Sequence, residues 1–467
     1  MSPRFRADSS LRRFGNLVVG GSPLRLFRMS QGGALAVDAM IAGDPLSPLQ
    51  LQLARRLADA GALHPEYSST VHPGAATAAD VTVVVPSFGT EVRDVPALAG
   101  VREVIVVDDA SPTPLAASPL HRLVRRERNG GPGAARNSGL AEVTTPFVAF
   151  VDSDTVLTAE RAAEWLDPLL AHFADERVAL VAPRVIGASG GCTLLDRYEA
   201  DRSPLDLGAE PARIAWGTRV GYVPAAAIVC RVESLRSVGG FDEGLRFGED
   251  VDLVWRLVRN GGVARYEPAV QVGHRARRSV VAWLDQRVGY GSSAAPLALR
   301  HPGALAPLRM SGWSALVWGL VAIRRPLAAA AVCAATSVAL TRKLRDLPAR
   351  EALRLAGLGH LYAGRQVAAA VTRAWWPIAV PLALVVRRMR WPLVAAFVLP
   401  ALLDWRGARR RAAAASGNQP LDAARFALMH VADDVAYSVG VWRGIRRVRS
   451  GAVLVPSFTN WPPRGDH

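Results

Sequence analysis

Four short runs of aliphatic residues constrain the fold most strongly, because each is almost continuously apolar and each is bounded by turns. The runs are VTVVVP (81–86), EVIVV (103–107), FVAFV (147–151) and VALVAP (178–183). Strands that helices cover on both faces have this composition, whereas half-exposed strands alternate apolar and polar residues. Helical patterns separate the runs. We therefore expect an α/β fold with a mostly parallel sheet flanked by helices.

Carboxylates follow two of these runs. EVIVV leads into Asp108 and Asp109, and FVAFV leads into Asp152 and Asp154. Ligands of open parallel sheets bind beyond the carboxyl ends of the strands, which places these acids at the expected site. Paired carboxylates are hard oxygen ligands that suit Mg²⁺ or Mn²⁺, with water and phosphate oxygens completing the shell. Taken alone, however, Asp-Ser-Asp is more typical of a solvated turn.

A glycine-rich segment between these acids predicts the start of a helix. Gly130 and Gly131 precede Pro132, a favourable first helical residue, and Arg136 follows one turn later. Backbone N–H groups at a helix start bind anions, and an arginine beside them favours a phosphate. An ordinary loop-to-helix turn would have the same sequence.

Two further candidates lie downstream. Glu249 and Asp250 stand where a helix is expected to begin, and the helix dipole stabilises carboxylates there. We expect this dipole to keep Asp250 ionised near neutral pH, as a general base requires. His274 follows a strand-like run and could complete a metal shell as a neutral imidazole, although a single histidine is more often a structural hydrogen-bonding residue.

Composition divides the chain into an N-terminal segment (1–66), a linker (67–80), an α/β domain (81–310) and an apolar C-terminal region (311–467). In the first segment, Ser47 as N-cap and Pro48 predict a helix, with Leu49, Leu53 and Leu57 at helical spacing and Gly61 near its end. The linker is rich in small residues, proline and glycine.

The C-terminal region contains apolar runs that arginines interrupt. Each run is shorter than the roughly 20 residues that span a bilayer, so we expect interfacial or buried helices. Tryptophans at the ends of the runs resemble an interfacial belt; they are Trp313, Trp375, Trp376 and Trp391. Peripheral or re-entrant contact with the cytoplasmic side of the membrane is the prediction, and burial against the α/β domain is the alternative.

The formal charge of +16 comes almost entirely from arginine, since Lys343 is the only lysine. A basic surface favours anionic partners. Nucleic acid is not expected, because the predicted helix after Ser47 carries only Arg55 and Arg56 against Asp59. The three cysteines, Cys192, Cys230 and Cys333, are widely spaced and fit neither a disulfide framework nor a zinc site. The N-terminus lacks an apolar run of signal-peptide length, so export is not expected.

Six motifs in this order and spacing resemble the family 2 glycosyltransferases of the GT-A fold. They are VTVVVPSF, VIVVDDAS, NGGPGAARNSGL, FVAFVDSD, GGFDEGLRFGEDVDLVWR and VGH, and they cover roughly residues 81–291. The resemblance implies a donor-nucleotide site. It assigns Asp109, and with it Asp108, to the base and ribose of a UDP-sugar, and Arg136 to the diphosphate. Pro86 and Asp152 complete this set.

The same resemblance implies the roles of the remaining acids. Asp154 would be the principal carboxylate for Mg²⁺ or Mn²⁺, with His274 as a further ligand. Asp250 would be the base of an inverting displacement, so that an α-linked donor yields a β-linked product. The segment WLDQRVGYG (283–291) lies in a position similar to that of the Gln-x-x-Arg-Trp motif of the family's processive synthases, but its sequence differs from that motif. A possible acceptor or diphosphate site consists of Glu249, Gln286 and Arg287.

A narrower resemblance combines the N-terminal segment, which is similar to small winged-helix-like peptide-binding domains, with the sequence of 221–257. It implies transfer of glucose from UDP-glucose to a peptide-derived redox cofactor or its precursor. Three alternatives remain. They are a membrane polysaccharide or lipid-linked sugar synthase, a nucleic-acid-binding protein, and a noncatalytic sugar-binding scaffold, which the presence of every required acid disfavours.

Overall fold

The computed structural model describes residues 4–67, 75–89, 98, 100–157, 162–188, 193–275, 277, 279–414 and 421–459. The chain forms two compact units, and each is described by itself. Unit 1 comprises Met1–Gly191 and Arg202–Ala276, and unit 2 comprises Cys192–Asp201 and Arg277–His467. The composition boundary at residue 310 therefore falls inside unit 2, because residues 277–310 pack with the helices that follow them.

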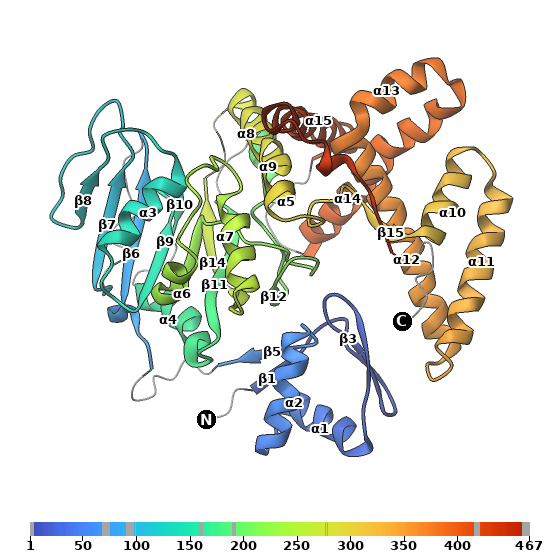
Figure 1. The fold of residues 1–467 in the computed structure, drawn as a ribbon, viewed down its shortest axis with the longest axis horizontal. Coiled ribbons are helices and arrows are strands. Elements are labelled where there is room, and N and C mark those ends of the chain that lie inside the picture. The colour runs from blue at the N-terminus through green and yellow to red at the C-terminus, as the bar shows by residue number, and fades with distance from the viewer. Residues whose placement is uncertain are drawn as a thin grey trace. The chain divides into compact units, whose positions relative to one another are not determined.

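Unit 1 contains a nine-stranded sheet (Figure 1). The strands lie in the order β10 (Thr155–Val156), β14 (Val263–His274), β11 (Val178–Gly187), β13 (Ala227–Arg231), β9 (Phe147–Val151), β6 (Val81–Ser87), β7 (Glu103–Asp108) and β8 (Arg122–Arg125), and β12 (Ala212–Ile214) pairs with β14. All but β10, β12 and β13 run in the same direction. The predicted mostly parallel sheet is confirmed, and the four apolar runs form β6, β7, β9 and β11.

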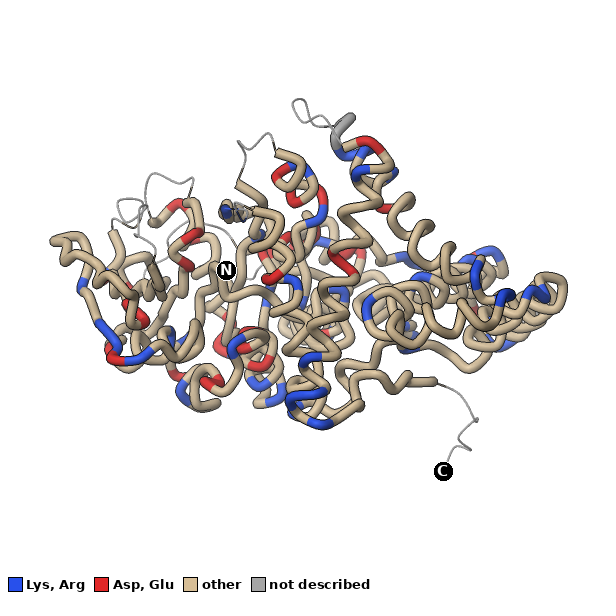
Figure 2. The backbone as a smooth tube through the Cα atoms, turned by 90° about the horizontal axis from the view of Figure 1, so that it is seen from above, with Lys and Arg blue, Asp and Glu red and all other residues tan. Residues whose placement is uncertain are grey.

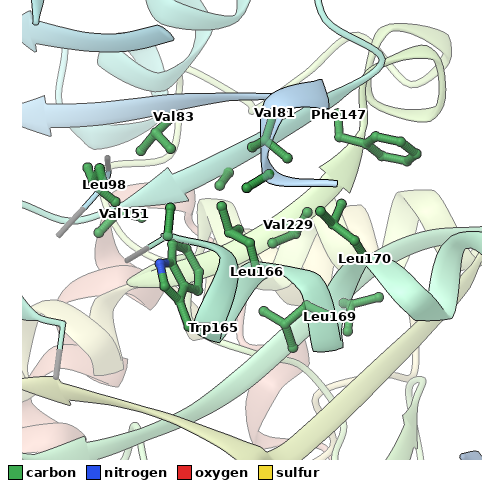
Figure 3. Packing of buried hydrophobic residues seen from close by; sticks show 14 of the residues in the cluster. Val81, Val83, Leu98, Phe147, Val151, Trp165, Leu166, Leu169, Leu170 and Val229 are labelled. Atoms are coloured by element: carbon green, nitrogen blue, oxygen red, sulfur yellow. The ribbon is translucent and has the colours of Figure 1, made fainter. Parts of the chain in front are cut away.

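The central strands β6 and β9 are mostly apolar and buried because helices cover them. All seven residues of β6 are buried. On one side, the helix α4 (Ala162–Leu170) places Trp165, Leu166 and Leu169 against Val81 and the neighbouring strands (Figure 3). This packing holds the strands whose carboxyl ends carry the predicted acids.

On the other side, the helix α3 (Pro132–Glu142) packs closely over β6 and β7. The close approach requires Gly139, since a Cβ atom at this position would lie 2.3 Å from a methyl group of Val84. The remaining helices of the domain are α6 (Val232–Ser237) and α7 (Glu249–Arg259).

The N-terminal segment belongs to unit 1 and has two small sheets and two helices. β1 (Arg4–Ala7) pairs with β5 (Leu63–Glu66), and β3 (Leu17–Gly20) lies between β2 (Arg12–Phe14) and β4 (Arg25–Arg28). The helices are α1 (Gln31–Ala42) and α2 (Pro48–Asp59).

The helix predicted after Ser47 is confirmed. The Ser47 side chain accepts from the Gln50 backbone, and the Gln50 side chain accepts from the Ser47 backbone, so both groups are paired at the start of α2. Of the leucines that suggested an apolar face, Leu57 is buried and Leu49 is 76% exposed. The buried face of α2 consists of Ala54, Leu57 and Ala58 instead.

Unit 2 is predominantly helical, as the C-terminal composition predicted. Its helices are α5 (Leu194–Arg202), α8 (Val280–Ser292), α9 (Ala294–Arg300), α10 (Gly312–Ala322), α11 (Pro326–Lys343), α12 (Ala349–Ala370), α13 (Trp376–Val385), α14 (Arg390–Ala414) and α15 (Ala423–Val448). β15 (Arg309–Ser311) and β16 (Ser457–Thr459) form a short parallel pair. Glycines let α8 and α15 touch, since a Cβ on Gly291 would lie 1.9 Å from the Tyr437 carbonyl oxygen.

One helical stretch is longer than the sequence suggested. A π-helical turn (371–375) joins α12 to α13, so that Ala349–Val385 is helical over 37 residues and long and apolar enough to cross a membrane. The expectation of runs too short to span is wrong for this stretch. The reason is that α12 continues through the π-helical turn into α13, so the helix does not end where the apolar run begins. Only 22% of its most apolar window is buried.

Charge is distributed along the chain. Figure 2 shows basic positions in all parts of the tube, with acidic positions interspersed among them. In unit 1 many of these charges pair with each other, as Arg177 does with Asp59 and Asp175.

Candidate active site

The carboxyl ends of the parallel strands bring the predicted residues to one edge of the sheet. Pro86 is buried in β6 opposite Val107 of β7, and Asp108 ends β7. Asp152 directly follows β9, and His274 ends β14. Residues from four strands, far apart in sequence, therefore share one edge because these strands run in the same direction.

Arg136 connects two acids of this edge. Its Nη2 atom lies 2.6 Å from Asp152 Oδ1 and its Nη1 atom 2.9 Å from Glu249 Oε1, while its guanidinium lies 5.3 Å from the centre of the Phe241 ring. The arginine is only 3% exposed. Burial disfavours its charge, but the two carboxylates outweigh this and hold the pKa of Arg136 above its ordinary value. The chain Asp152–Arg136–Glu249 thus ties the end of β9 to the start of α7.

Glu249 and Asp250 begin α7 as predicted, after Gly248 at a φ of 79°. Burial, and next the charge of Asp250, raise the pKa of Glu249 to about 7. Asp250 is half-buried; its Oδ1 accepts from the Val251 N–H at 2.8 Å and its Oδ2 from the Ala225 N–H at 3.4 Å. Burial raises the pKa of Asp250 as well. Burial therefore acts against the helix dipole at this carboxylate, and its ionisation near neutral pH stays a prediction.

Asp154 and His274 form the second pair of the site. The Asp154 Oδ1 and His274 Nε2 atoms are 3.1 Å apart, because Thr155 of β10 pairs directly with His274 of β14. Their side chains are 26% and 12% exposed.

This pair fits a divalent cation. Within the described part of the chain, no group of three or more His, Cys, Asp or Glu side chains forms a complete metal cage. Mg²⁺ and Mn²⁺ do not need one, since one or two protein ligands suffice when phosphate oxygens and water complete the shell. Asp152 is already held by Arg136, so Asp154 and His274 are the better-placed donors.

Asp108 and Asp109 are both buried and both partnered inside the protein. Asp108 accepts from the Ser111 N–H at 2.8 Å and pairs with Arg125. Asp109 accepts from the N–H groups of Gly130 at 3.0 Å and Gly131 at 2.7 Å. The helix-start donors that the sequence offered to a phosphate thus bind a carboxylate of the protein in this structure.

Sequence reasoning missed the arginines that hold these acids. Arg126 Nε lies 2.9 Å from Asp109, and Arg125 pairs with Asp108. The dipeptide Arg125–Arg126 at the end of β8 was the available signal, since adjacent cations at a sheet edge that also carries acids suggest ion pairs.

Gln286 and Arg287 lie in unit 2 on α8. Arg287 is 2% exposed and makes three polar contacts there: it pairs with Glu199, its Nε lies 3.0 Å from Asp433 Oδ1, and its Nη1 donates to Gln286 Oε1 at 3.3 Å. Its guanidinium also stacks 5.2 Å from the Trp283 ring. These contacts form a buried ion network within the helical unit. They do not test the acceptor or diphosphate role of Gln286 and Arg287, which stays a prediction.

Comparison with known proteins agrees with the motifs. The model of the family described as glycosyl transferase family 2 matches residues 96–237. The sheet and its carboxyl-edge acids define a glycosyltransferase of the GT-A type, and the chain belongs to glycosyltransferase family 2. It is 39% identical over 461 residues to the pre-mycofactocin glycosyltransferase of Mycobacterium tuberculosis, a match that covers 95% of each chain. The narrower resemblance in the sequence was to this same enzyme.

Two further matches are more distant. One covers a smaller part of this chain, and the other has a lower sequence identity to it. The succinoglycan biosynthesis protein ExoO of Rhizobium meliloti is 31% identical over 222 residues, which is 44% of this chain and 62% of ExoO. The structure of a mannosyltransferase from Pyrobaculum calidifontis in complex with GDP-Man and Mn²⁺ matches at 20% identity and a TM-score of 0.36, covering 71% of this chain and 92% of that one.

Proposed function

We propose that this glycosyltransferase moves glucose from UDP-glucose, with inversion, onto a peptide-derived redox cofactor or its precursor in mycofactocin biosynthesis. Support for the acceptor comes from the full-length similarity to an enzyme named for a mycofactocin precursor. One structural observation carries the chemistry. Asp250 lies half-buried beside the Asp152–Arg136–Glu249 chain, on the sheet edge that also holds Asp154 and His274.

Asp250 is the proposed base, and Glu249 is the weaker candidate. Glu249 is 6% exposed and its carboxylate is bound by Arg136, whereas Asp250 is partly accessible and its carboxylate accepts from the backbone N–H groups of Ala225 and Val251. Asp250 takes the proton from the acceptor hydroxyl as that oxygen attacks the anomeric carbon. The bond to the nucleotide diphosphate breaks on the opposite face, so an α-linked donor gives a β-linked product.

Asp154 and His274 would hold Mg²⁺ or Mn²⁺, which supplies positive charge to the departing diphosphate. Asp152 and Arg136 position this edge of the sheet. Their ion pair keeps Asp152 oriented beside Asp154, where it serves the ribose or a bound water. Pro86, Asp108 and Asp109 shape the nucleotide side of the site, with Asp109 fixing the start of α3.

We propose further that the enzyme works at the cytoplasmic face of the membrane. The helical stretch Ala349–Val385 supports contact with lipid, since most of its apolar window is accessible. A lipid-linked or polysaccharide acceptor is the alternative that the same stretch would suit.

A panel of UDP- and GDP-sugars with Mn²⁺, read by mass spectrometry of the acceptor, tests the proposal. We expect a hexose added from UDP-glucose to the peptide-derived precursor, and no such product without a divalent ion. Transfer to a polyprenyl-phosphate or polysaccharide acceptor alone would replace the proposed acceptor. Equal UDP affinity with and without Mn²⁺ would contradict the role of Asp154 and His274.

A further inference from the structure

A cavity of about 230 Å³ lies in unit 1 between the N-terminal segment and the sheet. β1, β5 and Tyr67 form one wall, and the other wall comes from the end of α4, the residues after it, β12 and the first half of β14. The polar side chains of the lining include Arg6, Glu66, His172, Arg265 and Glu267.

This cavity is separate from the candidate active site. Arg265 of β14 pairs with Val181 of β11, and His274 pairs with Gly187. These β11 positions are six residues apart, which at about 3.3 Å per residue is roughly 20 Å along the sheet. A small molecule in the cavity therefore cannot touch a donor sugar held at Asp154.

Both acids in the lining lie close to a nitrogen-containing side chain. Glu267 Oε2 lies 3.1 Å from His172 Nε2, and Glu66 Oε1 lies 3.9 Å from Arg6 Nε. Burial lowers the pKa of His172, which favours its uncharged form. A carboxylate only accepts, so Nε2 is the donor in the contact with Glu267.

Among the described residues, Arg265 is the buried basic residue of the lining that no acid binds at hydrogen-bonding distance. It is 5% exposed, its Nε has no hydrogen-bond partner among the described residues, and its nearest acid, Asp175, is 4.0 Å away. Asp175 is shared with Arg177, which lies 3.0 Å from Asp175 and 3.0 Å from Asp59. A buried guanidinium that no acid bonds directly is costly, and an anion in the cavity would stabilise it.

The walls favour a carboxylate over a phosphate. Apart from the charged residues and His64, they are formed largely by Pro65, Pro168, Pro211 and the rings of Tyr67 and Tyr266. Glu66 and Glu267 would repel a doubly charged phosphate more strongly than a singly charged carboxylate. The Tyr67 ring stands edge-on to His172 at 5.1 Å and covers part of the cavity.

We propose that this cavity is a second binding site, in which Arg265 binds the carboxylate of a small organic acid whose apolar part lies against the prolines and tyrosines. Because the walls come from the N-terminal segment and from the sheet, the bound acid links these two parts of unit 1. The site does not depend on the proposed acceptor or donor.

Benzoate is a suitable probe, with neutral benzamide as its isostere and inorganic phosphate as the competing anion. Titration of the full chain by calorimetry is expected to show benzoate binding at least tenfold more tightly than benzamide. Arg265→Gln is expected to abolish this preference. Arg55→Gln, which removes an exposed arginine of α2 outside the lining, is expected to retain it.

Ala269→Trp provides an independent test if Arg265→Gln fails to fold. Ala269 is an exposed lining residue, so the indole would fill the mouth of the cavity without disturbing the core, and benzoate binding should be lost. Equal binding of benzoate and benzamide to the wild-type chain, or an Arg265→Gln variant that keeps the preference, would overturn the proposal. Displacement of benzoate by an equal concentration of phosphate would overturn the assignment to carboxylates.

Discussion

Asp250 and Glu249 are adjacent in sequence and differ in their surroundings, which leads to different expectations for their substitution. Asp250→Asn keeps the shape of the side chain and removes its ability to accept a proton. We expect turnover to fall on the order of 10²- to 10⁴-fold, with UDP and Mn²⁺ affinity within about twofold of wild type. Initial rates of sugar transfer and calorimetry with UDP measure the two effects.

Glu233→Gln is the matched control for this substitution, because Glu233 is an exposed acid in the first turn of α6. Its turnover should equal that of wild type. An Asp250→Asn variant with unchanged transfer rates would remove Asp250 from the mechanism.

Glu249 predicts a pH dependence of stability. Its pKa is about 7 in the folded chain and near 4.5 when unfolded, so the folded state holds a proton that the unfolded state has released between these values. Stability contributed by the protonated form is therefore present below pH 4.5 and lost as pH rises to about 7, with a slope of at most about 1.4 kcal/mol per pH unit. Glu249→Gln should flatten this decline, since glutamine does not titrate and can still accept from Arg136. Thermal unfolding midpoints at pH 5 and pH 7.5 measure it; an equal decline in both proteins would refute the assignment.

At the scale of elements, the contact between α3 and the sheet depends on one glycine. Gly139→Ala would place a Cβ atom 2.3 Å from Val84 and 3.2 Å from Val107, so α3 must move outward. Overpacking of this kind costs roughly 1–3 kcal/mol, more than the helix propensity gained. We expect a lower unfolding midpoint, and lower activity because α3 carries Arg136.

Gly32→Ala in α1 is the control, since nothing lies within 4 Å of the added atom and stability should stay equal or rise. Equal midpoints for both variants would contradict the tight packing.

The elements that the sequence predicted are those with strong local signals. β6, β7, β9 and β11 are continuous apolar runs, and α2 and α3 begin at capping or proline signals. The strand β13 was not predicted, because its antiparallel place between β9 and β11 depends on pairing with distant segments. The same holds for the Arg136–Glu249 contact, which joins residues 113 positions apart. Local patterns place acids at strand ends, but only the tertiary structure shows which cation holds which acid.

At the scale of the whole molecule, exposed apolar side chains of unit 2 predict association with lipid. Leu384 is 68% exposed and Val385 is 83% exposed at the end of the 37-residue helical stretch, and Trp391 is 73% exposed shortly after it. The arginines of 387–390 follow directly and would lie at the level of anionic headgroups, where each basic residue contributes about 1 kcal/mol. We expect the full chain to sediment with vesicles that contain anionic lipid.

A double substitution of these two residues tests whether this surface makes the contact. Leu384→Glu with Val385→Glu replaces two apolar side chains by charges and should weaken vesicle binding at least tenfold, or about 1.4 kcal/mol. Leu49→Glu is the matched control, because Leu49 is a 76% exposed leucine on α2 of unit 1 and its substitution should leave binding unchanged. The two variants should transfer sugar equally well to a soluble acceptor, since neither touches the sheet edge of Asp250. A wild-type chain that stays in the supernatant with anionic vesicles would exclude membrane contact by this surface, and equal binding of all three proteins would assign the contact to another part of the chain.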